Sequence, residues 1–219
     1  MRIIEKSDFM AQAIGIRPRL DPPPRARCRI SYILGEHEPI CRTIQVNDER
    51  FFVSFPYITY MLREVDFGVD DIVERPGVRK FYISFSQTST TELTHVLRWT
   101  GLPNVLDNGE VCLGCHLIPD NDDLGFGSPF NIGGEFNLAT FNKVVGYFWM
   151  SSFTTDPLDL EWHGTKMLRR HFNLYDSCPY QAWADASEKD PNYGLKIEWP
   201  KLSGDSEVAH VSWESCVKN

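Results

Sequence analysis

Three short runs rich in β-branched and aromatic residues follow one another near the start of the chain, at residues 28–34, 40–46 and 51–55. Polar breaks at residues 35–38 and 47–49 separate them. Residues 79–86 also alternate, with Phe81, Ile83 and Phe85 on one face. Short alternating runs divided by brief polar turns are typical of an antiparallel β-meander, here of about four strands. Residues 57–65 fit either a strand or a helix, and Pro76-Gly77 predicts a turn after the acidic stretch that begins at residue 66.

Helical spacing is strongest after Asn137, which is a suitable N-cap for a helix over residues 138–152. Its aromatic and aliphatic stripe predicts core packing. Further helices are expected at residues 1–14, 165–172 and 181–188, and a strand at residues 194–199. Four prolines and four arginines between residues 15 and 27 predict an extended arm. Trp183, Trp199 and Trp213 are expected to be packing residues.

These patterns predict an α+β fold with three parts. Residues 1–27 form an N-terminal helix and a Pro/Arg-rich arm. Residues 28–160 form an α+β domain in which the meander is followed by a long loop and a packed helix. Residues 161–219 form a helical and irregular C-terminal extension. Because the stretch from Gly101 to Phe136 is too long for an ordinary connection, we expect it to be either functional or disordered.

Charge and composition narrow the function classes. The 219 residues carry a formal net charge of −8, which argues against nucleic acid as a partner because phosphate binding needs a basic face. No apolar run is long enough to span a bilayer, and the polar first residues do not resemble a signal peptide. We therefore predict no membrane partner and a location in the cytoplasm, or in a particle assembled there. The six cysteines are expected to be reduced.

The most informative segment reads L-P-N-V-L-D-N-G-E-V-C-L, from Leu102 to Leu113. It resembles the active-site stretch of ubiquitin-conjugating enzymes, which reads H-P-N, a short turn with a glycine, and then [IV]-C-L. The spacing of eight from Asn104 to Cys112 is the same as in that family. A later D-P-L at residues 156–158 also fits. Gly114 and the run at residues 148–154 are similar to the prokaryotic ubiquitin-conjugating-like proteins of the PRTRC system protein B type.

The resemblance implies a ubiquitin-conjugating-like fold and a cysteine transferase activity. Cys112 would carry a small ubiquitin-like modifier as a thioester, received from an adenylating enzyme, and Asn104 would donate to the oxyanion. No cofactor or metal is implied. The alternative is a non-catalytic structural or interaction subunit with the same fold, for example in a phage- or plasmid-encoded assembly, whose partners are other subunits.

Physical chemistry bears on the same residues. Acyl transfer through a thioester needs an accessible thiol and a hydrogen-bond donor near the carbonyl, and an asparagine amide can be that donor. Asn104 could instead only hold the loop backbone together. No Lys or Arg occurs between Trp99 and Asn142, whereas six acids do. Negative neighbours disfavour a thiolate, so we expect a raised pKa for Cys112.

Other chemistry can be assigned to the same cysteines. Cys112-Leu113-Gly114-Cys115-His116 matches the C-x-x-C-H pattern of c-type haem attachment, although attachment normally requires export. Cys112, Cys115 and His116 could also bind zinc, with a fourth ligand from His163, His171 or Cys178. A thioredoxin-like disulfide centre would need a helix that starts at the cysteines. Finally, Cys112 could be a buried, inert thiol.

Two further groups of charges have simpler interpretations. Lys166, Arg169, Arg170 and His171 form a basic face on the helix predicted at residues 165–172, which is either solvated or docks an acidic partner. The acids at residues 120–123 lack the spacing of a calcium-binding loop.

Overall fold

A computed structural model describes residues 2–10, 27–69, 72–89, 97–106, 108–111, 135–153, 163–174 and 178–202. Within these ranges the chain has an α+β fold with antiparallel sheets and three α-helices. Among the described residues, no helix combines the length and apolar character needed to cross a bilayer. The main strands are β1 (Arg2–Met10), β2 (Arg27–His37), β3 (Ile40–Val46), β4 (Glu49–Phe55), β5 (Tyr57–Val69) and β6 (Ile72–Ser86).

The strands of the predicted meander are confirmed, but the polar break at residues 35–38 is not a turn between paired strands: β2 and β3 form one arm of a long bent hairpin, and β4 and β5 form the other. β2 pairs with β5 and β3 pairs with β4, and the register is the same on both sides of the bend: His37 pairs with Ile58, and Ile40 with Phe55. This register places Pro39 opposite Pro56. Because neither proline has a backbone N–H, the ladder is interrupted there and the hairpin divides between two sheets. Their strand orders are β1-β2-β5-β6 and β4-β3-β7.

Two expectations near the ends of the long strands are wrong. The helix predicted at residues 1–14 is strand β1, which lies antiparallel to β2 and gains backbone hydrogen bonds at that sheet edge. The turn predicted at Pro76-Gly77 is absent, because β6 already begins at Ile72. Pro76 and Gly77 instead lie within β6, opposite the single residue Asp66 of β5. They fall between the pairs Val65–Val78 and Phe67–Arg75, and this two-to-one opposition is a β-bulge. The ambiguous residues 57–65 belong to strand β5.

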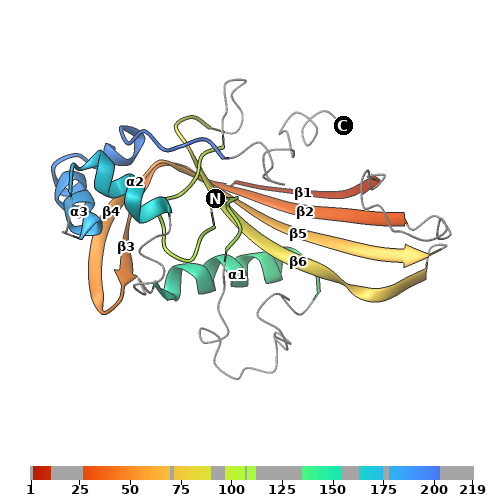
Figure 1. Cartoon of the computed structure of the whole chain (residues 1–219). Helices are drawn as coiled ribbons and strands as arrows, with labels where there is room; N and C mark the ends of the chain where they lie inside the picture. Colours follow the sequence, from red (N-terminus) through yellow and green to blue (C-terminus); the bar gives the residue numbers. More distant parts are fainter. Residues whose placement is uncertain are drawn as a thin grey trace, which may run out of the picture.

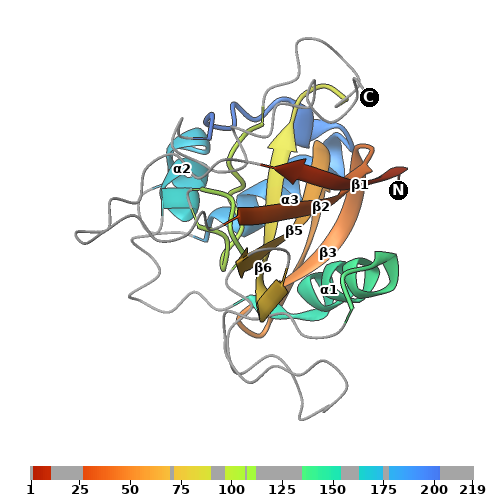
Figure 2. The ribbon, with the colours of Figure 1, turned by 90° about the vertical axis from the view of Figure 1, so that its right-hand side faces the viewer.

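The helix predicted after Asn137 is confirmed as α1 (Leu138–Met150). The side chain of Asn137 accepts a hydrogen bond from the backbone N–H of Thr140, at 2.9 Å. The short strand β7 (Ser152–Phe153) follows and lies parallel to β3. Figures 1 and 2 show α1 beside β6, where its buried stripe packs against the sheet.

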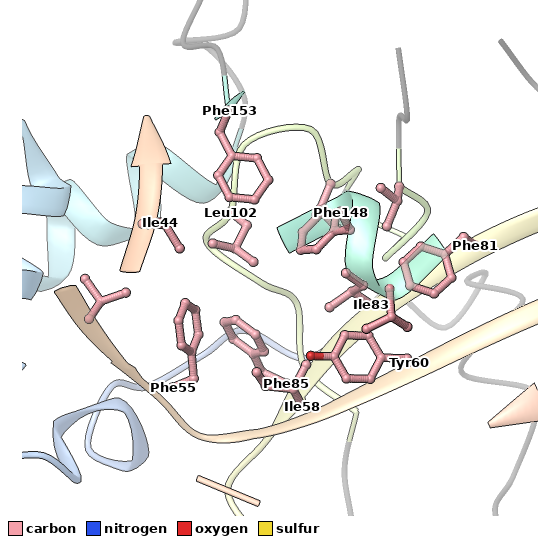
Figure 3. Packing of buried hydrophobic residues seen from close by; sticks show 14 of the residues in the cluster. Ile44, Phe55, Ile58, Tyr60, Phe81, Ile83, Phe85, Leu102, Phe148 and Phe153 are labelled. Atoms are coloured by element: carbon pink, nitrogen blue, oxygen red, sulfur yellow. The ribbon is translucent and has the colours of Figure 1, made fainter. Parts of the chain in front are cut away.

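Aromatic side chains fill the space between α1 and the sheet (Figure 3). Tyr60 lies in the centre and is fully buried, which raises the pKa of its phenol. It stacks on Phe81 and accepts a hydrogen bond of 2.8 Å from the indole of Trp149. The guanidinium of Arg42 lies over the ring of Trp149, 4.7 Å from the ring centre. The indole of Trp149 and the phenol of Tyr60 therefore satisfy each other inside the core.

The predicted helices of the C-terminal part are confirmed as α2 (His163–His171) and α3 (Pro179–Lys189). Trp183 and Trp199 are both fully buried and join the same core as the meander, so residues on both sides of position 160 contribute to it. The indole of Trp183 donates to the carbonyl oxygen of Ser54, and the indole of Trp199 donates to that of Gly194. Both tryptophans are the packing residues that the sequence predicts.

The strand predicted at residues 194–199 is wrong. A 3-10 helix, η3 (Tyr193–Leu195), stands at its start. Gly194 packs on the backbone where β4 ends, and a Cβ there would lie 2.8 Å from the carbonyl carbon of Phe55. This close backbone approach explains the glycine and leaves no space for a strand with side chains on both faces. Trp213, the Pro/Arg stretch at residues 15–26 and the acids at residues 120–123 lie outside the described residues.

Candidate functional site

The segment that carries the motif forms a small hairpin, described at residues 105–106 and 108–111 and called the site hairpin below. Val105 and Val111 are paired antiparallel, and the N–H of Leu106 donates to the carbonyl oxygen of Glu110, at 2.8 Å. Gly109 has a φ of 83°, a conformation that favours glycine. The side chain of Asn108 accepts from the N–H of Glu110, at 2.9 Å. The turn predicted from Asp107-Asn108-Gly109 is thus confirmed at its two described residues.

The site hairpin is attached to the edge of β6. The N–H of Val111 donates to the carbonyl oxygen of Phe81 at 2.8 Å, and the N–H of Ile83 donates to the carbonyl oxygen of Gly109 at 2.9 Å. A third link joins side chains: the ammonium of Lys80 lies 2.9 Å from a carboxylate oxygen of Glu110. The hairpin therefore extends the sheet, and its position is fixed by backbone and by charge.

Residues 101–105, which lead into the site hairpin, are fixed by contacts with the core and with helix α3. Leu102 and Val105 are buried in the main core, and Pro103 is buried between them. Tyr180 donates its phenol hydrogen to the carbonyl oxygen of Gly101, at 3.0 Å, from helix α3. These contacts fix the backbone on either side of Asn104, and a reactive group needs such support from its surroundings.

Asn104 has a φ of 63°, in the left-handed region where asparagine is one of the few tolerated residues. Its side chain is partly exposed. It makes no hydrogen bond to another described residue, whereas the neighbouring Asn108 ties the turn together. Within the described part of the chain, the loop-holding role considered for Asn104 therefore belongs to Asn108, and the amide of Asn104 remains available as a donor.

Cys112 lies outside the described residues, directly after Val111. Cys115 and His116 also lie outside them, so the haem, zinc and disulfide alternatives stay predictions. Among the residues that are described, no group of three potential metal ligands occurs. Of the further zinc ligands considered, Cys178 is exposed, and His171 forms a hydrogen bond of 3.1 Å with the phenol of Tyr193.

The positive charges near the site hairpin come from strands that are distant in the sequence. Arg63 on β5 and Lys80 on β6 are paired across the sheet, on the face where Lys80 meets Glu110. Burial raises the pKa of the neighbouring Tyr82 to about 12, against a smaller opposite effect of Arg63. The absence of Lys and Arg between residues 99 and 142 does not include these two basic residues, because they lie earlier in the sequence. The alternation of residues 79–86 was the available signal, because it places Lys80 and Tyr82 on one face.

Comparison of the chain with protein-family models, with curated proteins and with solved structures gave no match.

Proposed function

We propose that this protein is an acyl carrier of the ubiquitin-conjugating-like type, which holds a small ubiquitin-like modifier as a thioester on Cys112. The observation that carries the proposal is the pairing of Val105 with Val111. Asn104 directly precedes one member of this pair, and Cys112 directly follows the other. In an antiparallel pair, the chains on both sides of a bridge run beside each other. The pairing therefore supports a site in which the amide and the thiol meet.

The proposed chemistry needs only an activated acyl group and an amine. The Cys112 thiolate attacks the carbonyl carbon of the modifier's C-terminal thioester on an adenylating enzyme. The new C–S bond forms first and gives a tetrahedral oxyanion, which then collapses, breaks the old C–S bond and releases the enzyme's thiolate. An acceptor amine then attacks the same carbon, forms a C–N bond and loses a proton, and Cys112 leaves as thiolate. In both steps the Asn104 amide donates to the oxyanion.

A second candidate function is supported by two exposed apolar side chains. Phe52 on β4 and Met150 at the end of α1 are 55% and 75% exposed. Exposed large apolar residues can mark contacts with other proteins. They favour the structural alternative, in which the fold is a subunit that binds partners through its surface. The two functions differ in one observable property, the reactivity of Cys112.

Thiol labelling of the native protein tests this property. Iodoacetamide is added at neutral pH, and each cysteine peptide is quantified by mass spectrometry over time. We expect Cys112 to be alkylated at a rate similar to that of Cys178, which is exposed and free. Cys41 should react more slowly, because it is partly buried and burial raises its pKa.

The variant Cys112→Ala should lose that one labelled peptide and leave the labelling of Cys178 unchanged. Labelling of Cys112 only after unfolding in urea, while Cys178 reacts in the native protein, would contradict the carrier proposal. The structural alternative would then be the better account.

A further inference from the structure

We propose that Lys80 and Glu110 form a positioning pair for the candidate site, which cancels the acidic charge beside Cys112 and thereby sets the proton affinity of that thiol. This inference rests on the proposed function, because it needs a reactive Cys112. Both members of the ion pair lie within the described residues. The acidic residues along the segment predict a raised pKa for Cys112, and Lys80 adds a positive charge that the segment itself lacks.

The geometry of the pair supports a role at the hairpin. Lys80 approaches Glu110 to 2.9 Å, and their side chains are 37% and 18% exposed. Glu110 stands two residues before Cys112 and is bridged across the sheet edge to Tyr82.

Three neighbouring groups on the sheet face the pair. Strand β5 contributes Arg63, β6 contributes Tyr82, and β2 contributes Tyr32, which lies opposite Arg63. Tyr82 is neutral near pH 7, because burial raises its pKa to about 12. Arg63 adds positive charge on the same face. Loss of Lys80 would remove the ammonium that contacts Glu110 and make the local charge more negative, whereas loss of the Glu110 charge would make it more positive.

Sequence proximity connects the pair to the thiol. Val111 is buried on the core side of the sheet, whereas Glu110 meets Lys80 on the other side. Cys112 follows Glu110 by two residues in the sequence. At that separation, either charge of the pair changes the balance between thiol and thiolate.

The two single variants are expected to act in opposite directions. In Lys80→Met, the pH midpoint of Cys112 alkylation should rise by about 0.5 to 1 unit, because the remaining carboxylate disfavours the thiolate. In Glu110→Gln, the midpoint should fall by a similar amount. Lys80→Arg keeps the charge and should restore the native midpoint. The rate of iodoacetamide alkylation is measured from pH 6 to 10 on the Cys112 and Cys178 peptides of each full-length variant.

Lys196→Met is the matched control. It removes the lysine of another ion pair, with Asp190, at 2.6 Å. It should leave the Cys112 midpoint unchanged, and the Cys178 midpoint should be constant in all variants. A merely structural role would move both pair variants in the same direction, because either change loosens the hairpin. A common direction, or no shift, would therefore overturn the inference.

Failure of the inference and failure of the proposed function give different results. A reactive Cys112 that shows no opposite shifts removes the inference alone. A reactive Cys112 that shows the shifts but accepts no acyl group removes the carrier function alone. A Cys112 that is unreactive in the native protein removes both. If Lys80→Met unfolds, Glu110→Gln still tests the sign of the effect.

Discussion

Replacement of Trp183 by alanine is expected to lower the free energy of unfolding by about 3–5 kcal/mol, the usual range for a fully buried aromatic side chain. Trp183 is 0% exposed and has edge contacts with Phe55 at 5.2 Å between ring centres. It also packs against Trp199 at 5.4 Å, and its indole donates to the carbonyl oxygen of Ser54. The variant therefore creates a cavity and removes the donor for a buried carbonyl. Urea unfolding followed by circular dichroism measures the effect.

The control is Phe52→Ala, an aromatic truncation at the 55% exposed position on the neighbouring strand β4. It should cost about 0.5 kcal/mol or less, as exposed substitutions usually do. Equal losses for the two variants would contradict the arrangement in which α3 shares its core with the meander. An unfolding transition of α3 separate from that of the sheet would contradict it as well.

Removal of the Asn104 amide is expected to slow acyl transfer from Cys112 by about 10²- to 10³-fold, the usual loss for one oxyanion donor. Asn104→Asp keeps the shape and tolerates the left-handed backbone, but replaces the donating NH₂ by an acceptor. The rate is measured by single-turnover discharge of the Cys112 thioester to a free amine.

Asn104→Gly separates chemistry from conformation. Glycine adopts the φ of 63° without strain, so it preserves or relaxes the backbone while removing the amide. The oxyanion role predicts a loss as large as that in Asn104→Asp. Full activity of the glycine variant would show instead that Asn104 only shapes the backbone. Asn108→Ala should have a smaller effect, because it loosens the turn without touching the proposed donor.

The local parts of the fold follow from the sequence because their signals are local. The alternation of residues 79–86 identifies the core of β6, and the Asn137 cap begins α1 where predicted. Strand β1 could not be identified in this way, because it is stabilised by pairing with β2 more than by its own pattern. The 3-10 helix at Tyr193–Leu195 depends on the contact between Gly194 and distant β4, which no local pattern reveals.

Some features of the candidate site also follow from local signals in the sequence, whereas others depend on contacts between distant residues. The turn at Asn108 and Gly109 follows from residue types with known backbone preferences, and it is confirmed there. The docking of the hairpin on β6 and the pair of Lys80 with Glu110 join residues about thirty positions apart. A count of charges along one segment could not include them. The raised pKa expected for Cys112 rests on the charges of that one segment and stays a prediction, because Cys112 lies outside the described residues.

Transfer of an acyl group to Cys112 is the most direct test of the account. A synthetic peptide that ends in Gly-Gly as an alkyl thioester is incubated with the native protein, and the adduct is located by intact and peptide mass spectrometry. We predict one acyl group on Cys112, removed by hydroxylamine and absent from Cys112→Ala. Acylation of exposed Cys178 without acylation of Cys112 would contradict the central claim, because the reagent would then reach a thiol but find no acceptor at the site hairpin.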